Sequence, residues 1–287
     1  MQPLVSIATP VYNAMPYLSS YLDSLIDQSY ENIQLILVDD ESTDGSADCI
    51  RSYKDRLEKR FSSFSFISIP HAGQAAAMNR ALGLVEGEYF TWCDADDLLT
   101  PQSIEAKVRY LIENQDVSLV RGNGLRVDAA SLKEMGEYAS SSDKVKKNIF
   151  DDLLLDRTYC FAGCYMVRTK MLFSCYPDKK IPVSAEGQNL QLLLPVASRT
   201  ECGYVEGILH YYRIHGDSHS QRKRSYSESL TRIKNFTKLR LEILEYCAVD
   251  TQRYKIVVEQ IERQSIRQLA CDAVRKVRSE GNGNCCS

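Results

Sequence analysis

Residues 33–46 read IQLILVDDESTDGS, and this stretch gives the clearest indication of the architecture. Its apolar first part, residues 33–38, is typical of a strand that is buried on both faces of a parallel sheet. The polar turn that follows leads into a helix that we expect to continue to residue 59. A buried strand, a polar turn and a helix in this order predict an α/β protein.

The same alternation continues toward residue 121. Apolar runs predict further strands at 4–9, 64–69, 88–93 and 117–121, and amphipathic patterns predict helices at 18–26, 74–85 and 101–114. Thr100 is the expected N-cap of the last of these helices. The rhythm predicts an open, Rossmann-like, mainly parallel sheet flanked by helices. Ligands of such sheets bind beyond the carboxyl ends of the strands, so we expect chemistry at the loops that follow Thr9, Val38 and Cys93.

Composition limits the classes of protein that the chain can belong to. Of its 287 residues, 44% are hydrophobic and 25% are charged, as in soluble globular proteins. The net charge of −3 argues against a nucleic-acid partner, which requires a clear basic excess. No apolar run approaches the roughly 20 residues that cross a bilayer. The ten cysteines are scattered and no export signal is recognisable, so we expect reduced thiols and a cytoplasmic protein.

Two parts are expected along the chain. Residues 1–220 form the α/β domain, with a regular half at 1–115 and a less regular half at 116–220 that contains one clear helix near 188–198. Residues 221–287 form a C-terminal helical extension with an apolar stripe at helical spacing. This stripe packs on the domain or on a second subunit, or it belongs to a basic amphipathic helix that rests on an anionic membrane.

Two carboxylates follow the strand expected at 88–93. Asp94 and Asp96 are two residues apart, and on an extended backbone such residues project to the same side. Two carboxylates on one side can bind a hard cation such as Mn²⁺ or Mg²⁺, which prefers oxygen ligands. The ion can then bridge a diphosphate. The alternative is that these acids, together with Asp97, cap the following helix.

Two other strand ends carry side chains suited to a nucleoside. Asp39 and Asp40 end the run at 33–38, where a carboxylate can bind the N–H groups of a base or a ribose hydroxyl. The later residues of that turn, Asp44 among them, are better suited to cap the next helix. Tyr12, just after Pro10, offers a flat ring on which a nucleobase can stack.

Four segments in this order resemble the family 2 glycosyltransferases of the GT-A fold: TPVYN at 9–13, VDDESTDGS at 38–46, HAGQAAAMNRAL at 71–82 and EGEYFTWCDADD at 86–97. The resemblance is good over the first 115 residues, with weaker similarity at 186–194 and 210–220. It implies an enzyme that transfers a sugar from a nucleotide-diphosphate donor with inversion of configuration. A UDP-sugar is the commonest donor in the family and is our expectation here.

The resemblance also implies the roles of single residues on the donor side. The positions that line the nucleoside pocket and the start of the donor-sugar pocket correspond to Pro10, Tyr12, Asp40, Gly73, Gln74 and Asn79. Asp94 and Asp96 match the Asp-x-Asp motif of the family, with Asp96 as the direct ligand of Mn²⁺ or Mg²⁺. Arg213 and His215 lie where related enzymes place a loop over the diphosphate, so we expect a phosphate contact from the arginine and a metal contact from the histidine. Met78 departs from the family, which often has an arginine at this position.

The general base is less clearly implied. Many members of the family carry Glu-Asp at the start of a helix in the acceptor half, and the aspartate deprotonates the acceptor. Residues 185–189 read AEGQN here, so Gly187 replaces that aspartate and Glu186 becomes the candidate base. Alternatively, Glu186 caps its helix and the base is supplied elsewhere.

The expected acceptor is a hydroxyl of a glycan, a glycoprotein or a lipid-linked molecule. A lipid-linked acceptor would place the protein at the inner face of the membrane, and the C-terminal helices would contact the bilayer or form a homodimer. The competing class is a non-catalytic glycosyltransferase-like module that binds nucleotides or glycans, or acts as a scaffold. A dehydrogenase or a P-loop enzyme is excluded because the chain lacks their glycine-rich phosphate loops.

Overall fold

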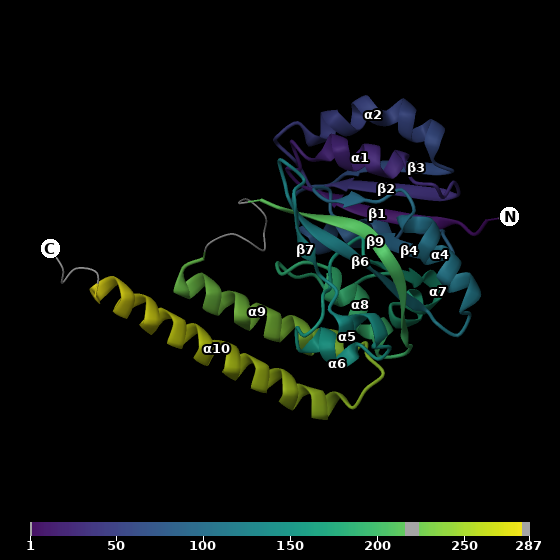
Figure 1. Ribbon diagram of the computed structural model, residues 1–287. Helices are drawn as coiled ribbons and strands as arrows, with labels where there is room; N and C mark the ends of the chain where they lie inside the picture. Colours follow the sequence, from purple (N-terminus) through teal and green to yellow (C-terminus); the bar gives the residue numbers. More distant parts are fainter. Residues whose placement is uncertain (1, 216–223, 283–287) are drawn as a thin grey trace.

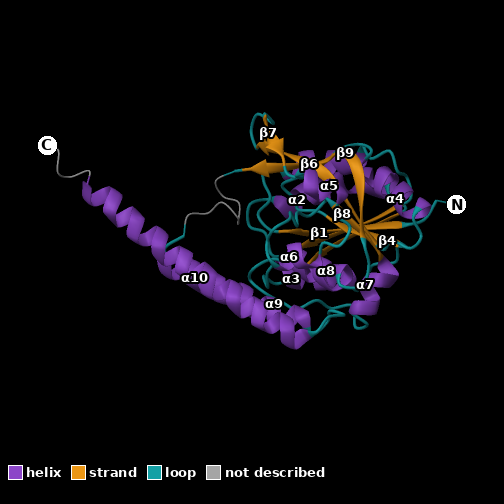
Figure 2. Ribbon diagram, turned by 60° about the horizontal axis from the view of Figure 1, so that its bottom comes forward, coloured by secondary structure: helices purple, strands orange, loops and turns teal. Residues whose placement is uncertain are grey.

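The computed structural model describes residues 2–215 and 224–282, which form an α/β body and two long C-terminal helices (Figure 1). A nine-stranded sheet lies at the centre, with the strand order β3-β2-β1-β4-β8-β6-β9-β5 and β7 paired to β6. Helices lie on both faces of this sheet (Figure 2). The expected α/β architecture, with flanking helices and a helical extension, is confirmed.

The first half of the chain alternates strands with helices as the sequence predicted. Its elements are β1 (Val5–Val11), α1 (Leu18–Ile26), β2 (Ile33–Asp39), α2 (Ser46–Arg60), β3 (Ser63–Ser68), α3 (Gln74–Leu82), β4 (Tyr89–Trp92), β5 (Leu98–Leu99) and α4 (Ser103–Glu113). Strands β3, β2, β1 and β4 are parallel neighbours. Every residue of β1 and β2 is buried, which explains their continuous apolar sequences. The carboxyl ends of these strands therefore meet at one edge.

The second half completes the sheet with mixed pairing. Its elements are β6 (Leu119–Asp128), β7 (Glu134–Glu137), α5 (Ser141–Val145), α6 (Phe150–Leu154), β8 (Tyr165–Arg168), α7 (Thr169–Cys175), α8 (Asn189–Ala197) and β9 (Cys202–Ile214). Strand β8 is antiparallel to both β4 and β6, whereas β6 and β9 form a long parallel pair. The long pairings of the sheet are thus parallel, and the short β8 joins its two parallel parts.

One local prediction was wrong, and one predicted strand has different bounds. Thr100 does not cap α4, because its hydroxyl donates to the carbonyl of Ile208 at 3.0 Å and the N-cap position is taken by Gln102. The cause is the short strand β5, which pairs with β9 just before α4 and draws Thr100 toward β9. The strand expected at 117–121 is longer, since β6 pairs with β9 as far as Asp128.

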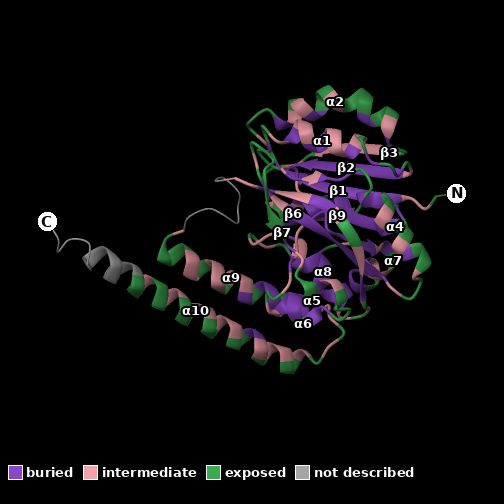
Figure 3. Cartoon of the chain, in the orientation of Figure 1, coloured by how far each residue is buried: buried purple, intermediate pink, exposed green. Residues whose placement is uncertain are grey.

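Apolar side chains form two buried clusters that involve the sheet, and many of the buried residues lie along its strands (Figure 3). One cluster joins the sheet to α1, α2 and α4, through residues such as Leu22, Ile50 and Ile104. The other joins it to α3, α7, α8 and α9, and it includes Leu193 and Ile243. Each fully buried side chain of this size contributes about 1.5–3 kcal/mol relative to an exposed one. Helix α9 is therefore part of the main core.

The C-terminal extension is a hairpin of α9 (Tyr226–Leu244) and α10 (Thr251–Asn282) beside the lower part of the body (Figure 1). Ser225 starts α9 with a capping box that it shares with Glu228. No helix in the described ranges 2–215 and 224–282 is long and apolar enough to cross a bilayer. The expected boundary between residues 220 and 221 falls within 216–223, outside the described residues. The cysteines of the described ranges carry free thiols.

Candidate active site

The loops after β1 and β2 are joined to each other at the carboxyl edge of the sheet. Asn13 Oδ1 accepts the backbone N–H of Thr43 at 2.8 Å. Asp44 accepts the backbone N–H groups of Met15 at 2.8 Å and of Ser46 at 3.0 Å. The second bond satisfies an N–H in the first turn of α2, but Gly45 occupies the N-cap position, so Asp44 acts from one residue before the expected cap. The two loops therefore form one rim.

Asp40 is buried beneath this rim and holds the loop that precedes α3. Its Oδ1 accepts the N–H of Ala72 at 2.8 Å, and its Oδ2 accepts the N–H of Gly73 at 2.9 Å. His71 Nδ1 lies 2.9 Å from the same Oδ2. The carboxylate thus accepts two backbone N–H groups of one loop and lies beside the His71 ring of the same loop. Its direct contact with a nucleobase stays a prediction.

Tyr12 and His71 form a flat aromatic surface beside Asp40. Tyr12 is 51% exposed, and its ring stacks on His71 with the centroids 4.4 Å apart and the planes inclined by 27°. Pro10 is buried at the end of β1 and positions the loop that carries Tyr12. A cavity of about 500 Å³ opens at the ends of β2 and β3, and its lining includes Asp39, Ser42, Ser68 and Pro70. The lining of this cavity also includes Ala47 and Arg51 of α2 but neither Tyr12 nor His71, so the exposed aromatic surface is the feature that suits a nucleobase.

Residues 94–97 form a tight turn after β4, where Asp97 donates its N–H to the carbonyl of Asp94 at 3.3 Å. The expectation that Asp94 and Asp96 project from an extended strand was therefore wrong. Asp94 Oδ1 accepts from Gln74 Nε2 at 3.0 Å and lies 3.5 Å from Gln188 Nε2. Burial, with the charges of Asp96 and Asp97, raises the pKa of Asp94 well above its ordinary value. A cation would relieve this concentration of negative charge.

The start of α3 connects the two acidic positions. Gly73 bonds Asp40, and the next residue, Gln74, bonds Asp94. Gly73 has a φ of +89°, a conformation that glycine adopts without strain. Asp40 and Asp94 are therefore brought to one side of the sheet edge by two consecutive residues. This is the convergence of strand ends that the sequence predicted.

Asp97 fixes the acidic turn to β9. It is 1% exposed, its Oδ1 accepts the backbone N–H of Arg213 at 2.9 Å, and its Oδ2 lies 3.1 Å from His210 Nε2. The other ring nitrogen of His210 contacts the hydroxyl of Tyr138. Burial and the charge of Asp96 raise the pKa of Asp97 well above its ordinary value. Asp97 is thus a link between strands, and the alternative that it caps α4 was wrong.

The end of β9 brings His215 and Arg213 to the acidic turn. His215 Nε2 lies 3.0 Å from Asp96 Oδ2. Arg213 is 5% exposed, and its guanidinium donates to the carbonyl of Asp96 at 3.2 Å and to Ser20 Oγ at 2.9 Å. Burial lowers the pKa of Arg213. In this arrangement the arginine stabilises the turn, and its contact with a phosphate stays a prediction.

The side chains around the turn are chemically suited to a divalent cation. Asp94 and Asp96 offer carboxylate oxygens, and a neutral His215 offers a ring nitrogen. The carboxylate of Asp96 is 33% exposed, so an ion in solution can reach it. Within 2–215 and 224–282, no three potential ligands already lie close enough together to enclose an ion. Asp96 and His215 are nevertheless in contact, as the metal prediction requires.

Comparison with known proteins identifies the family. The family model for glycosyl transferase family 2 matches residues 6–174. The chain belongs to glycosyltransferase family 2. An uncharacterized glycosyltransferase of Haemophilus influenzae is 40% identical over 121 residues, 42% of this chain and 47% of that protein. The putative teichuronic acid biosynthesis glycosyltransferase TuaG of Bacillus subtilis is 34% identical over 112 residues, 39% of this chain and 43% of TuaG. The matches thus span less than half the length of these curated relatives.

Solved structures confirm the GT-A fold of this family 2 glycosyltransferase. TarS 1–349 of S. aureus, in complex with UDP-GlcNAc, superposes with a TM-score of 0.64 and 16% identity over 92% of this chain and 71% of TarS 1–349. The mannosyltransferase PcManGT of Pyrobaculum calidifontis, with GDP-Man and Mn²⁺, gives a TM-score of 0.63 and 15% identity over 97% of this chain and 76% of PcManGT. At such low identities these matches establish the fold alone.

Helix α3 contains one departure from the family pattern. Met78, where family 2 glycosyltransferases often have an arginine, is fully buried in the core. The side-chain amide of the neighbouring Asn79 makes two hydrogen bonds with the backbone of Ile181. Its Nδ2 donates to the carbonyl of Ile181 at 2.9 Å, and its Oδ1 accepts the N–H of Ile181 at 2.8 Å. Asn79 therefore holds the segment that leads to Glu186. Its expected contact with the donor stays a prediction.

The second departure lies at the expected general base. Glu186 Oε2 lies 3.1 Å from Arg232 Nε, and its Oε1 accepts from Asn235 Nδ2 at 3.0 Å. The alternative that Glu186 caps α8 was wrong, because Gln188 occupies the N-cap position. Gly187 has a φ of +95°, so the residue that replaces the family's aspartate also has a backbone conformation that favours glycine. Both oxygens of Glu186 thus have partners on α9, and its role as a base stays a prediction.

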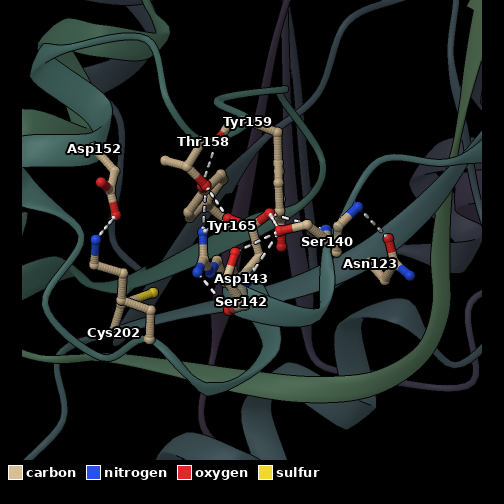
Figure 4. Close-up of polar contacts among 12 residues, drawn as sticks. Asn123, Ser140, Ser142, Asp143, Asp152, Thr158, Tyr159, Tyr165 and Cys202 are labelled. Atoms are coloured by element: carbon tan, nitrogen blue, oxygen red, sulfur yellow. Dashed lines mark hydrogen bonds and ion pairs between the residues drawn. The ribbon is translucent and has the colours of Figure 1, made fainter.

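A polar network supports the loop that follows α6 (Figure 4). Arg121, fully buried on β6, donates to Thr158 Oγ1 at 2.7 Å and to the carbonyl of Asp143 at 2.5 Å. Asp143 in turn forms a capping box with Ser140 at the start of α5. We interpret this network as support for the second half of the α/β domain, residues 116–220.

Sequence reasoning missed four residues that shape the site. His71 lies three residues after β3, in a segment that the resemblance already marked, so its position was a usable signal. Gln188 and His210 also lie in segments with weaker similarity, but the pairing of His210 with Asp97 could not be predicted from the sequence. Arg232 gave no such signal, because its partner Glu186 is far away in the sequence.

Proposed function

We propose that this chain is a metal-dependent, inverting glycosyltransferase that transfers a sugar from a nucleotide-diphosphate donor, a UDP-sugar in the first instance, to an acceptor hydroxyl. The observation that carries this proposal is the bridge from Asp40 through Gly73 and Gln74 to Asp94. It joins an aromatic surface suited to a base with an acidic turn suited to a cation. Donor complexes of TarS and PcManGT, which share the fold, support it.

In this proposal, the chain's own residues divide the work of binding. Tyr12 stacks on the base, and His71 and Asp40 keep the neighbouring loop in place. Mn²⁺ or Mg²⁺ would be held by Asp96 with Asp94 and His215, and when bound it supplies positive charge for the departing nucleoside diphosphate. Gln74 and Gln188 hold Asp94 in the orientation that this requires.

Glu186 is the proposed general base. Its carboxylate would accept the proton of the acceptor hydroxyl, on a glycan, a glycoprotein or a lipid-linked molecule. The acceptor oxygen attacks the anomeric carbon as the bond from that carbon to the diphosphate oxygen breaks, which inverts the configuration. Each carboxylate oxygen of Glu186 keeps a second lone pair beside its contact with α9, so an oxygen can accept the proton while both contacts are kept.

Release of free nucleoside diphosphate from a panel of UDP-, GDP- and ADP-sugars, with and without Mn²⁺, tests the proposal. We expect metal-dependent release with at least one donor, and faster release when an acceptor glycan is added. No release with any donor, despite measurable binding, would overturn it in favour of a non-catalytic binding module. The paired carboxylate of Glu186 and the glycine at 187 are the observations that favour this second function.

We also propose that the protein is cytoplasmic and meets a lipid-linked acceptor at the inner face of the membrane. Lys234 and Lys238 are exposed on one side of α9 and could contact anionic headgroups. Flotation with vesicles that contain anionic lipid should be reduced in the double variant Lys234→Glu, Lys238→Glu. Equal flotation of both proteins would contradict the membrane contact, and size-exclusion chromatography of the same pair tests the alternative of a homodimer.

A further inference from the structure

Helix α9 of the C-terminal extension contacts the α/β domain at Glu186, the proposed general base. Glu186 has a side chain that is only 7% exposed, and both of its oxygens are used by α9. Arg232 supplies one partner and Asn235 the other, at 3.1 Å and 3.0 Å. Hydrogen bonds to an ionised group are strong, and burial protects them from screening by solvent. The pair of contacts therefore fixes the orientation of the carboxylate.

The three residues after Glu186 make contacts that connect this part of the chain to the acidic turn and to the end of β4. The carbonyl of Gly187 accepts from Gln191 Nε2 at 2.6 Å. Gln188 is 1% exposed and reaches Asp94 Oδ1 at 3.5 Å. Asn189 Oδ1 accepts from the indole N–H of Trp92, at the end of β4, at 2.7 Å. A displacement of Glu186 would thus disturb the residues that hold Asp94.

We propose that Arg232 and Asn235 are positioning residues for the transfer reaction: they hold Glu186 and, through residues 187–189, the side of the cleft that contains Asp94. The proposal rests on the proposed glycosyl transfer, because the arrangement matters for rate only if Glu186 and Asp94 serve that reaction. It makes α9 a functional part of the acceptor half, although this helix lies beyond the segment that the family model matches.

The same helix provides a matched control. Arg240 lies two turns after Arg232, it is 6% exposed, and it pairs with Asp156 Oδ2. Both guanidinium groups lie over the ring of Phe236, at 5.3 Å and 5.4 Å from its centroid. The two arginines thus share helix, ring contact and an acidic partner. The two arginines differ in their partners, because Glu186 directly precedes residues 187–189 and Asp156 does not.

The experiment compares Arg232→Met with Arg240→Met in the full chain, with nucleoside diphosphate release and thermal unfolding as readouts. We expect Arg232→Met to lower kcat by about ten- to a hundredfold, as small misplacements in an active site do, with the donor KM changed by less than about threefold. Arg240→Met should leave kcat within about threefold of wild type, and the Tm of each variant shows how much of its effect comes from lost stability. Arg232→Lys should recover part of the lost kcat. Equal kcat losses in the two methionine variants would overturn the proposal.

A double-mutant cycle covers the case in which either methionine variant folds poorly. If Arg232 acts through Glu186, the variant Glu186→Ala, Arg232→Met should be no slower than Glu186→Ala alone, because alanine leaves Arg232 no side chain to hold at this position. Multiplicative losses would mean that Arg232 acts independently, which contradicts the proposal. If the wild-type protein releases no nucleoside diphosphate from any donor, the proposed function itself fails. Normal wild-type release that Arg232→Met retains overturns only the role of α9.

Discussion

The proposed donor side and the proposed acceptor side of the site are built in different ways. On the proposed donor side, Asp40, Gly73, Gln74 and Asp94 are linked by hydrogen bonds between loops that follow parallel strands of one sheet. On the acceptor side, Glu186 depends on Arg232, a residue 46 positions later on a helix of the extension. A site made from strand ends leaves a readable pattern in the sequence. A site completed by a distant helix does not.

Asp96→Ala tests the donor side and should have the largest effect. We expect nucleoside diphosphate release to fall by at least about 10³-fold, because a catalytic metal ion contributes several kcal/mol of charge stabilisation. Release assays at increasing Mn²⁺ measure the loss, with unfolding by circular dichroism as the control for folding. Full activity with normal dependence on Mn²⁺ would remove Asp96 from the reaction.

Glu186→Gln tests the acceptor side and should have the next largest effect. General bases contribute about 10²–10⁴-fold, so we expect kcat to fall by about 10²-fold while the Kd for UDP is unchanged. Glutamine keeps the shape of the side chain and can still contact Arg232 through its carbonyl oxygen. A variant that keeps wild-type kcat would show that the carboxylate anchors α9 without acting as a base.

Tyr12→Ala measures the aromatic surface, and its effect should be confined to nucleotide affinity. Loss of a stacked ring weakens the binding of a base by about 1–3 kcal/mol. Calorimetric titration with UDP should show this loss, while titration with inorganic diphosphate should be unchanged. An equal loss for both ligands would mean that the ring shapes the loop and does not contact the base.

Lys107→Met tests the contact between α4 and the segment that contains Gly163, and it should have the smallest effect. This fully buried lysine on α4 donates to the carbonyl of Gly163 at 2.6 Å, and burial lowers its pKa to about 8. An unfolded lysine has a pKa of about 10.4, so between these values the unfolded chain binds more protons and stability rises with pH. Below pH 8 the lysine is protonated in both the folded and the unfolded state, so it adds no pH dependence to the free energy of unfolding. Urea unfolding of wild type and Lys107→Met from pH 7 to 10 should show their difference growing with pH, and a constant difference would contradict a lowered pKa.

Whether a segment could be predicted from the sequence depended on whether local or long-range interactions determine its conformation. The strands β1 and β2 were predictable because residues buried on both faces leave a continuous apolar run. The turn at residues 94–97 was not, because Asp97 is held by His210 and Arg213 of β9, and these contacts draw the backbone out of an extended path. Thr100 does not cap α4 for a similar reason, because its hydroxyl donates to the carbonyl of Ile208 on β9. Local patterns therefore predicted the elements and the acidic residues, while long-range contacts decided how those residues are oriented.

Gly187 has a consequence for any attempt to restore an acid at this position. An aspartate with the same φ of +95° would strain its backbone by about 1–3 kcal/mol. Gly187→Asp would therefore place a carboxylate beside Glu186 at a cost in stability, because the main chain here has a conformation that favours glycine.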